Sequence, residues 1–557
     1  MHQVVEVVQQ GVRRPWRADS GKRSTPTDRR VDPETIADRG GFKYLQSPGE
    51  GVNFANRLNR AARNTPDRVA AADPRRSLTY DELRSETDRF AASLEDQGID
   101  QGETVGLLLP NSATFVATYY GTMKRGAVPL PINLRFDPET VSYVLEDADV
   151  EAVVTAAPFV ELIQAAGGDS VDTVIVAGEG SGGTQDYREF VAAGAAEFDV
   201  YPRKEDELAH IVYTSGTTGR PKGVRHTHGN LRANADGFVR YMKWDEHDIA
   251  LTVCPCFHVA GLNAGVNPFV TVGAENHLLP EWDVETALSK IADREVTYVG
   301  LIPTMILDLL AHDGLDDYRL DSVEIVVTGG APMPRDRIDS VEELFDCTLI
   351  ETWGMTESSP LAVINRPDRE RKPGSIGLVA EEVAEVRIED VDSEEPVETG
   401  ETGEMLITGD TVMDGYHNLP EANREAFVDR GGRRWLRSGD IGYRDEDGFL
   451  FIEDRIDHMI ITGGENVYPS RIEDVLYELA AVDEAAVVGT PHERLGEVIT
   501  AVIVDGSGEL TVDDVERKCR EASLADYMIP RRVEFVDEIP KTATQKIDKV
   551  ALEKSLS

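Results

Sequence analysis

The stretch from residue 213 to residue 224 reads Tyr213-Thr-Ser-Gly-Thr-Thr-Gly-Arg-Pro-Lys-Gly-Val224. It combines four aliphatic hydroxyl groups with three glycines and one lysine, so the backbone can bend tightly while hydroxyls and amides surround anionic oxygens. The run before it, His210-Ile-Val-Tyr213, is short and β-prone, which predicts that the loop leaves the end of a strand, where α/β proteins bind ligands. The candidate anion-binding residues are Thr214, Ser215, Gly216, Thr217, Thr218, Gly219 and Lys222.

This loop differs from the phosphate loop of Walker A proteins, because that pattern cannot be laid over Gly216 to Gly223. A flexible surface turn is the structural alternative, but turns seldom combine so many hydroxyls with an embedded Pro-Lys-Gly. We therefore interpret the segment as a phosphate-binding loop of another class.

Helices and short apolar strands alternate through the first part of the chain. Apolar residues recur at helical spacing from Asn53 to Ala62, which predicts a helix. Continuous apolar runs predict strands at 105–110, 128–132, 152–155 and 173–177. This alternation is typical of a largely parallel sheet covered by helices on both faces. Shorter runs with more glycine between Glu382 and Tyr443 predict a β-rich subdomain.

The last hundred or so residues form a second pattern. An amphipathic helix is expected at 470–479, strands at 485–489 and 500–504, and another helix at 515–525. We expect a disordered basic tail over residues 1–45, an N-terminal domain over 46–455 and a small domain over 456–557. The predicted fold class is therefore α/β, with a large N-terminal domain of layered sheets and helices, a β-rich subdomain and a small α+β C-terminal domain.

The chain is strongly acidic. It carries 102 acidic and 57 basic residues, for a formal net charge of −45, and only thirteen of the basic residues are lysine. A heavily carboxylated surface keeps a protein hydrated in concentrated salt, so the composition is typical of halophilic proteins. The same charge makes nucleic acid and anionic membranes poor partners.

Cysteine usage and hydropathy indicate a cytoplasmic setting. Four cysteines in 557 residues are too few for a disulfide framework, and no apolar run is long enough to cross a bilayer or to act as a secretory signal. Cys254-Pro-Cys256 has the close spacing of zinc ligands but lacks a second pair, so we do not expect a metal there.

Further motifs, in a fixed order, carry a family resemblance. Glu351-Thr-Trp-Gly-Met-Thr-Glu357 follows the strand-like Ile325-Val-Val-Thr-Gly-Gly-Ala-Pro332, and Trp435-Leu-Arg-Ser-Gly-Asp440 lies further on. Together with the loop at 213–224 they resemble the motifs of the adenylate-forming superfamily, which includes acyl-CoA synthetases, aryl-CoA ligases, peptide-synthetase adenylation domains and firefly luciferase. The resemblance runs from about Asn53 to the carboxyl end, and implies ATP, Mg²⁺ and coenzyme A as the co-substrates and cofactors.

The resemblance implies a nucleotide site. Gly330, Ala331 and Pro332 would pack around adenine, and Trp353 would stack near it, where relatives more often carry tyrosine. Thr356 would contact the α-phosphate and Glu357 would hold magnesium, a role that suits a carboxylate. Asp440 would accept hydrogen bonds from the ribose hydroxyls. The remaining implied nucleotide-binding residues are Glu351, Thr352, Gly354 and Arg455.

The resemblance also implies a C-terminal domain that acts as a mobile lid. Asp457 matches the family hinge, and Gly463, Gly464 and Glu465 match the segment that lines the coenzyme A channel. In Pro540-Lys-Thr-Ala-Thr-Gln-Lys-Ile-Asp548, Lys546 matches the lysine required for adenylation, although Gln545 stands where glycine usually precedes it. A solvated surface lysine is the alternative for Lys546, and the neighbouring Lys541 and Lys549 do not match the motif position.

Histidines near these motifs have two open interpretations. His258 matches a gate between nucleotide, acid and thiol tunnel in relatives, and a packed core histidine is the alternative. His226 and His228 could suggest a metal pair, but they open the helix expected after the loop and are interpreted as structural.

The resemblance predicts an ATP-dependent carboxylic acid:CoA ligase that forms an acyl-AMP and then an acyl-CoA. Medium- or long-chain fatty acids are the expected substrates. The alternatives are an aryl-CoA ligase, a stand-alone ligase that loads a carrier protein, a luciferase-like oxygenase, and a degenerate nucleotide-binding protein. Because eleven residues follow Lys546, no fused carrier domain is expected. Small-molecule acid, ATP and coenzyme A are the expected partners, with a homodimer as one open alternative for the oligomeric state.

Overall fold

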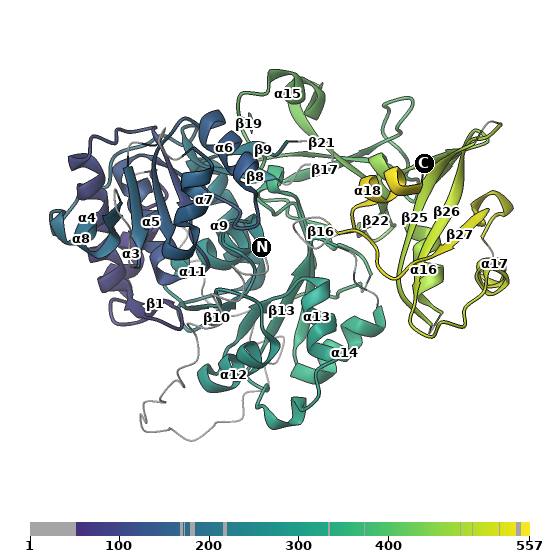
Figure 1. Ribbon diagram of the computed structural model, residues 1–557, viewed down its shortest axis with the longest axis horizontal. Coiled ribbons are helices and arrows are strands. Elements are labelled where there is room, and N and C mark those ends of the chain that lie inside the picture. Colours follow the sequence, from purple (N-terminus) through teal and green to yellow (C-terminus); the bar gives the residue numbers. More distant parts are fainter. Residues whose placement is uncertain are drawn as a thin grey trace. The chain divides into compact units, whose positions relative to one another are not determined.

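A computed structural model describes residues 52–557 except for 168–170, 172, 179–183, 215–219, 332, 334, 373, 480, 493, 523, 542–546 and 557. The tail expected over 1–45 lies outside the described residues. The chain forms two compact units (Figure 1). The first unit contains the described part of residues 1–214, with Gly223–Ala384 and Gly409–Pro420, and the second contains 215–222, Glu385–Thr408 and Glu421–Ser557.

One sheet of the first unit is entirely parallel. Its five strands lie in the order β4-β3-β5-β6-β7, and their bounds are Val128–Pro131 (β4), Thr104–Leu108 (β3), Val150–Ala156 (β5), Thr173–Ala177 (β6) and Gln185–Asp186 (β7). All four strands expected from the apolar runs are confirmed. Parallel strands covered on both faces are apolar along their whole length, which is why their positions could be predicted from short continuous runs.

A second sheet has nine strands, in the order β16-β15-β14-β13-β12-β10-β11-β1-β2. Its central strands are parallel and its edge strands β2, β15 and β16 are antiparallel. The bounds are Val69–Ala72 (β1), Ser77–Thr79 (β2), Ile249–Thr252 (β10), Glu275–Leu278 (β11), Tyr298–Gly300 (β12), Ile325–Gly329 (β13), Thr348–Trp353 (β14), Val363–Ile364 (β15) and Leu378–Val379 (β16).

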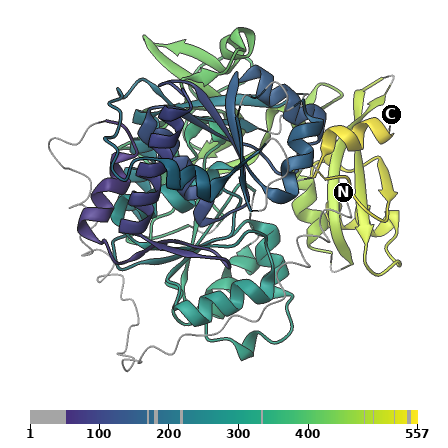
Figure 2. The same cartoon turned by 60° about the vertical axis from the view of Figure 1, so that its left-hand side comes forward.

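Helices cover both sheets of this unit. On the nine-stranded sheet, α12 (Val284–Arg294), α13 (Pro303–Leu310) and α14 (Arg335–Phe345) share one apolar core with the strands. On its other face, α9 (His228–Met242) and α11 (Asn267–Val272) form a separate core (Figures 1 and 2). The five-stranded sheet is covered by α6 and α7 on one face and by α3, α4, α5 and α8 on the other. Their bounds are Asn56–Asn64 (α3), Tyr80–Asp96 (α4), Ala113–Arg125 (α5), Pro138–Asp147 (α6), Val160–Ala165 (α7) and Tyr187–Ala193 (α8).

Local sequence explains where these helices begin and end. Thr79 caps α4, since its hydroxyl accepts from the amide of Glu82 while the Glu82 carboxylate accepts from the amide of Thr79. Ser112 caps the start of α5, where its hydroxyl accepts from the amide of Phe115. Gly126 ends the same helix with φ of 80°. Caps of this kind fix the register of a helix on its sheet, so the apolar face meets the core.

A three-stranded sheet frames the glycine-rich loop. Its strands lie in the order β19-β9-β8, with bounds Gly415–Tyr416 (β19), Lys222–Thr227 (β9) and Leu208–Thr214 (β8). The predicted strand before the loop is confirmed. The expectation that residues 226–228 open a helix is wrong for His226, which lies on β9; α9 begins at His228 because Thr227 forms a capping box with Asn230.

The second unit opens with the predicted β-rich subdomain. A five-stranded sheet has the order β17-β18-β21-β20, with β22 paired to β21. The bounds are Glu385–Glu389 (β17), Gly403–Thr408 (β18), Phe427–Arg430 (β20), Arg433–Arg444 (β21) and Leu450–Arg455 (β22). The acidic residues of this segment meet arginines across the sheet: Arg430 bonds Glu389 at 3.0 Å, and Arg433 bonds Glu385 at 2.7 Å. Part of the acidic surface is therefore neutralised locally.

The rest of the second unit is the predicted α+β domain. One sheet, in the order β24-β23-β26-β25 with β27 on β26, packs with α16, α17 and α18. The bounds are Ile460–Thr462 (β23), Glu465–Val467 (β24), Val482–His492 (β25), Gly496–Asp505 (β26), Arg532–Phe535 (β27), Ser470–Tyr477 (α16), Val512–Glu521 (α17) and Lys549–Leu556 (α18). The helix expected at 515–525 begins three residues earlier, because Thr511 and Asp514 form a capping box.

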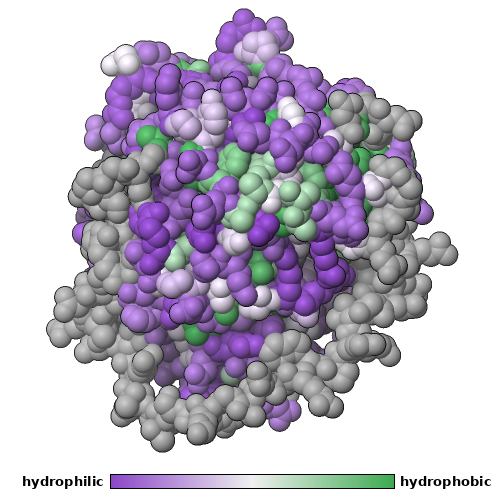
Figure 3. Space-filling model, turned by 90° about the vertical axis from the view of Figure 1, so that its left-hand side faces the viewer, coloured by the Kyte–Doolittle hydropathy of each residue, from purple (hydrophilic) through white to green (hydrophobic). Residues whose placement is uncertain are grey.

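The surface agrees with the composition. The face of the molecule drawn in Figure 3 is largely hydrophilic, with a limited apolar area near its middle. Among the helices of the described residues, none is both long enough and apolar enough to cross a membrane.

Candidate functional site

Two sequence motifs meet at the carboxyl edge of the nine-stranded sheet. Strands β13 and β14 pair in parallel with Gly329 opposite Thr352. Gly330 and Ala331 therefore follow β13 beside the place where Trp353 ends β14 and Gly354 follows it. Glu351 lies one position before this edge, and its carboxylate accepts a long hydrogen bond of 3.4 Å from Asn365 Nδ2. The parallel strands thus bring together residues that the sequence places twenty positions apart. Pro332 lies outside the described residues.

Glycine is required at this edge by close packing of the backbone. A Cβ on Gly354 would lie 1.9 Å from the carbonyl oxygen of Pro360, and a Cβ on Gly329 would lie 2.7 Å from that of Thr352. Gly330 adopts φ of 82°, which disfavours other residues. Trp353 is buried, whereas Gly330 and Ala331 are exposed. The edge therefore presents bare backbone beside an indole, a surface that suits a flat apolar ring.

The next turn holds a buried carboxylate. Thr356 and Glu357 begin a short 3-10 turn and are both 8% exposed. The hydroxyl of Tyr416 donates to Glu357 Oε1 at 2.8 Å, and the amide of Met413 donates to the Glu357 carbonyl at 2.9 Å. A carboxylate held in one orientation supplies hard oxygen ligands, so Glu357 fits a magnesium ion, and Thr356 is brought beside it.

A group of buried histidines lies behind this turn. His226 Nε2 lies 2.7 Å from the Thr356 carbonyl, and His226 Nδ1 lies 2.7 Å from His210 Nε2. His228 Nδ1 accepts from the amide of Phe54 at 3.1 Å. Because both ring nitrogens of His226 are engaged by the protein, His226 has no nitrogen left to share a metal ion with His228.

Burial holds these histidines neutral. Desolvation lowers the pKa of His226 to about 4 and that of His228 to about 3, and it lowers the pKa of His210 well below its usual value. A neutral imidazole in the folded state binds fewer protons below pH 6.5 than the same residue in the unfolded chain. Each of these histidines therefore weakens the fold as the pH falls from 6.5 toward its own folded pKa.

We expect His228→Gln to reduce the loss of stability in acid. Below pH 6.5 the free energy of unfolding of the wild type should fall more steeply than that of the variant, by about 1.4 kcal/mol per pH unit, because one buried titrating group is removed. Chemical denaturation at pH 7.5, 6.5 and 5.5 measures the difference. His247→Gln is the matched control, because its imidazole is 79% exposed and should leave the slope unchanged. Parallel slopes for wild type and His228→Gln would contradict this explanation.

The segments on both sides of the glycine-rich loop are anchored. Thr214 ends β8 and Lys222 begins β9, whereas Ser215, Gly216, Thr217, Thr218 and Gly219 lie outside the described residues. The Tyr213 hydroxyl donates to Asp147 Oδ2 at 2.5 Å, and a Cβ on Gly223 would lie 2.9 Å from the Tyr213 ring. The Asp147 carbonyl in turn lies 3.0 Å from His417 Nε2. The ends of the loop are therefore fixed on a rigid frame.

The second unit brings three predicted residues together. Asp440 on β21 pairs with Arg455 on β22, and Arg455 Nη1 lies 3.1 Å from Asp440 Oδ1. Arg455 Nη2 lies 3.8 Å from Asp457 Oδ2. Gly439 adopts φ of 70°, and a Cβ there would approach the Arg455 guanidinium to 3.0 Å. The predicted ribose ligand and the predicted hinge residue are thus joined through one arginine.

The paired glycines of this unit form a tight hairpin turn. Gly463 and Gly464 connect β23 to β24 with φ of 65° and 92°, as a two-residue turn of a hairpin requires. A Cβ on Gly464 would meet nothing within 4 Å, and Glu465 is exposed. The turn explains the glycines by itself, so a role for them in binding coenzyme A stays a prediction.

Two lysines near the carboxyl end pair with carboxylates of their own unit. Lys541 pairs with Glu484 at 2.5 Å, and Lys549, whose side chain is largely buried, pairs with Glu473 at 2.8 Å. Gln545 and Lys546 lie outside the described residues.

His258 and the two neighbouring cysteines have simple structural settings. His258 is exposed and caps α10 (Val259–Gly261), where its Nδ1 accepts from the amide of Ala260, so it is not a packed core residue. Cys254 and Cys256 are buried free thiols, and burial raises the pKa of Cys254 to about 12. Within the described residues, the only group of side chains close enough to share a metal ion lies elsewhere, on the turn at 245–247.

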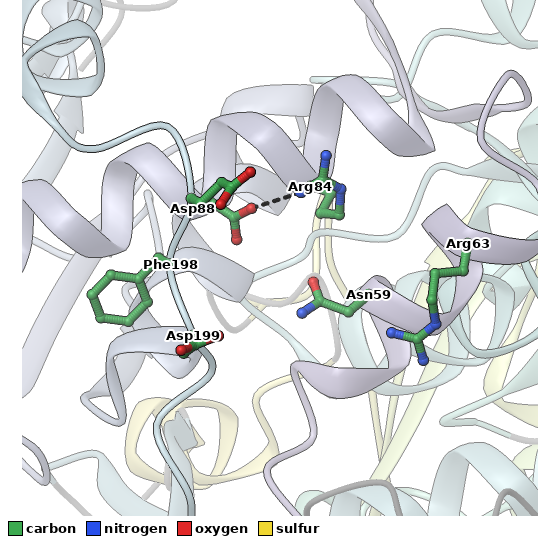
Figure 4. Close-up of a pocket in the computed structure, with 7 residues that line it drawn as sticks. Asn59, Arg63, Arg84, Asp88, Phe198 and Asp199 are labelled. Atoms are coloured by element: carbon green, nitrogen blue, oxygen red, sulfur yellow. Dashed lines mark hydrogen bonds and ion pairs between the residues drawn. The ribbon is translucent and has the colours of Figure 1, made fainter.

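A separate hollow of about 560 Å³ opens beside α3 and α4 (Figure 4). Its lining contains none of the predicted site residues; it consists of Asn59, Arg63, Arg84, Asp88, Glu197, Phe198 and Asp199. Asp88 is already paired with Arg84 at 3.0 Å and with the buried Lys124 at 2.5 Å. Because Asp88 and Arg84 already have partners within the protein, we do not assign this hollow a ligand.

Comparison with known proteins identifies what these arrangements belong to. Residues 58–417 match the model of the AMP-binding enzyme family, and residues 471–546 match the model of the AMP-binding enzyme C-terminal domain. The long-chain-fatty-acid–CoA ligase FadD13 of Mycobacterium tuberculosis is 33% identical, over 86% of this chain and 93% of its own length. Feruloyl-CoA synthase of Amycolatopsis is also 33% identical, over 88% and 96%. The crystal structure of ATP-bound MatB from Rhodopseudomonas palustris aligns with a TM-score of 0.83 and 28% identity, covering 91% of this chain and 99% of MatB.

Proposed function

Because the chain belongs to the AMP-binding enzyme family and is an ATP-dependent carboxylic acid:CoA ligase, we propose how its residues divide the reaction. In the first half, an oxygen of the acid attacks the α-phosphorus of ATP and pyrophosphate leaves, which gives an acyl-AMP. In the second half, the thiol of coenzyme A attacks the acyl carbonyl and AMP leaves. The observation that carries this proposal is the buried, oriented carboxylate of Glu357 beside Thr356.

The first half is proposed to use Thr356, Glu357 and Lys546. Thr356 would donate to an oxygen of the α-phosphate, and Glu357 would hold the magnesium ion. When bound, magnesium neutralises charge on the polyphosphate. The ammonium of Lys546 would place the attacking carboxylate against the α-phosphate and stabilise the charge that develops as pyrophosphate leaves.

Nucleotide binding is proposed to use three groups of motif residues. The bare backbone at Gly330 and Ala331 and the indole of Trp353 support adenine, and the loop from Thr214 to Lys222 supports the phosphates. Asp440 would accept from the ribose hydroxyls with the carboxylate that Arg455 already orients at 3.1 Å. The remaining motif residues would support this surface: Glu351, Thr352, Gly354 and Pro332.

The second half is proposed to follow rotation of residues 456–557 as a lid. Asp457 begins this segment, and a few backbone dihedrals at a hinge are enough for such a rotation. Gly463, Gly464 and Glu465 would then line the path of coenzyme A. The exposed position of the His258 imidazole at the start of α10 supports a gate role.

Medium- or long-chain fatty acids are the proposed substrates. The similarity to FadD13 supports this choice, and the equal similarity to feruloyl-CoA synthase supports aromatic acids as the second candidate. The apolar stretch around α13 does not help to choose between fatty and aromatic acids. Its residues Met305, Ile306 and Leu309 are buried in a core cluster.

A screen of pyrophosphate release tests the substrate. Acetate, octanoate, palmitate, benzoate and 4-coumarate are supplied with ATP, Mg²⁺ and coenzyme A in concentrated potassium chloride. We expect octanoate or palmitate to give the highest kcat/KM. A preference for 4-coumarate or benzoate would replace the fatty-acid assignment with an aryl one, and no acid-dependent pyrophosphate release would contradict the two-step scheme.

Adaptation to concentrated salt in a reducing cytoplasm is also proposed, from the net charge of −45 and the four free cysteines. We expect the thermal unfolding midpoint to rise as potassium chloride increases from 0.1 to about 2 M, because salt screens the repulsion between carboxylates. Calorimetry in potassium chloride measures the midpoint, and sucrose at matched water activity is the control. Sucrose stabilises proteins because it is excluded from their surface but does not screen charges, so the comparison isolates the effect of screening. A midpoint that is highest at low salt would contradict this proposal.

A further inference from the structure

A continuous chain of buried hydrogen bonds runs from the core to the Thr356 carbonyl. Tyr120 Oη bonds Asn267 Oδ1 at 2.9 Å, and Asn267 Nδ2 lies 3.4 Å from Tyr119 Oη. Tyr119 Oη lies 2.9 Å from His210 Nδ1. His210 then contacts His226, which contacts Thr356, at 2.7 Å in each step.

The direction of donation in this chain is fixed by its last member. The Thr356 carbonyl can only accept, so His226 Nε2 carries a proton and donates. Since burial holds His226 neutral, its Nδ1 accepts, and His210 Nε2 must donate to it. By the same reasoning His210 Nδ1 accepts from the Tyr119 hydroxyl, whose oxygen is then left to accept from the Asn267 amide. One tautomer of each histidine satisfies every contact.

This chain joins the parts of the protein that handle phosphate. His210 lies on β8 and His226 lies on β9, the two strands on either side of the glycine-rich loop. Thr356 immediately precedes Glu357, and its carbonyl accepts from His226 Nε2 at 2.7 Å and from the Ser359 amide at 3.2 Å. Every side chain in the chain from Tyr120 to His226 belongs to a residue that is less than 2% exposed, so water cannot substitute for a lost partner.

We propose that His226, supported by His210, is a positioning residue for the first half of the reaction. It sets the backbone of Thr356 and thereby the direction of the Glu357 carboxylate, relative to the strands that carry the phosphate loop. This inference rests on the proposed function of Glu357. Outer-layer partners of a metal ligand typically contribute about 10–100-fold to affinity or activity, which sets the size of the effect.

His226→Leu tests the proposal, with His226→Gln as the conservative variant. Leucine fills the space but leaves the His210 Nε2 proton unpaired and the Thr356 carbonyl with the Ser359 amide as its remaining donor. Glutamine can donate to the Thr356 carbonyl and accept from His210 Nε2. We expect His226→Leu to lower acid-dependent pyrophosphate release and to raise the Mg²⁺ concentration at half-saturation, each about 10-fold or more. His226→Gln should restore most of the pyrophosphate release and most of the Mg²⁺ affinity.

Two further readouts separate positioning from a loss of folding. Conversion of supplied octanoyl-AMP and coenzyme A to octanoyl-CoA involves no polyphosphate, so His226→Leu should retain it within about 3-fold of wild type. Titration calorimetry with the magnesium complex of α,β-methylene-ATP should show about 10-fold weaker binding. The matched control is His228→Leu, which removes another buried histidine two residues away that contacts Phe54 instead of Thr356.

The outcomes are distinct. One outcome overturns the proposal: His226→Leu and His228→Leu lose the same thermal stability, and both keep the wild-type Mg²⁺ concentration at half-saturation. His226 would then have a structural role only. An equal loss in both half-reactions also overturns the proposal. If the wild type itself releases no pyrophosphate with any acid, the proposed function fails, and the calorimetric comparison of the same variants still decides whether His226 positions the metal site.

Discussion

Lys546→Ala is expected to abolish acyl-AMP formation and to leave thioester formation intact. An ammonium that bridges the attacking carboxylate and the α-phosphate acts only while pyrophosphate leaves, so its loss should lower the first half-reaction at least about 10³-fold. Transfer of the acyl group from supplied octanoyl-AMP to coenzyme A should change less than about 3-fold. Single-turnover assays of each half-reaction, with labelled ATP and with octanoyl-AMP, measure the two effects separately.

Three variants sharpen this test. Lys541→Ala and Lys549→Ala remove lysines that pair with Glu484 and Glu473, so both should retain acyl-AMP formation. Asp457→Pro should show the reverse of Lys546→Ala, because a fixed φ at the hinge residue would block rotation of the lid after adenylation. Equal loss of both half-reactions in Lys546→Ala and Asp457→Pro would argue against separate lid positions for the two steps.

Glu357→Gln is expected to lower the rate of acyl-AMP formation by about 10²–10³-fold. The amide keeps an oxygen that can accept from Tyr416 but loses the negative charge that a hard cation requires. The half-saturating Mg²⁺ concentration should rise in parallel, whereas transfer from octanoyl-AMP should be nearly unchanged. Initial rates of pyrophosphate release across a Mg²⁺ titration measure both quantities.

Tyr416→Phe provides the matched comparison for Glu357→Gln. It removes only the hydroxyl that donates to Glu357 Oε1 at 2.8 Å, so a loss of about 10-fold is expected, smaller than that of Glu357→Gln. If Tyr416→Phe were as defective as Glu357→Gln, the carboxylate would owe its role to the hydrogen bond instead of to its charge. Wild-type Mg²⁺ dependence in Glu357→Gln would remove Glu357 from the metal site.

The parts of the fold that rest on local pattern could be predicted from sequence. The strands β3 to β6 are continuous apolar runs, and the strand-like run that begins at Ile325 is β13 in the structure. The pairing of Asp440 with Arg455 also follows from two adjacent antiparallel strands. In each case residues close in sequence, or a regular sheet, determine the geometry.

What could not be predicted depends on contacts between distant segments. Tyr119 and His210 are 91 residues apart, and His226 and Thr356 are 130 apart, so no periodicity connects them. Tyr416 lies on a two-residue strand, β19, whose partner β9 ends at Thr227, within the segment where the sequence predicts the start of a helix. A fully buried histidine in an otherwise apolar strand, as at His210 on β8, is the one local signal that could have indicated a buried polar network.

The close approach of Gly354 to the Pro360 carbonyl limits how this enzyme can be redesigned. Since a single added carbon there would collide with the carbonyl of Pro360 at 1.9 Å, even alanine is excluded without a shift of the main chain. Libraries intended to change nucleotide preference should therefore randomise the neighbouring exposed position Ala331 and the aromatic position Trp353, and hold Gly354 constant. In a clone with any other residue at position 354, the sheet edge must have changed its backbone conformation. A change in specificity in such a clone could not be assigned to the new side chain alone.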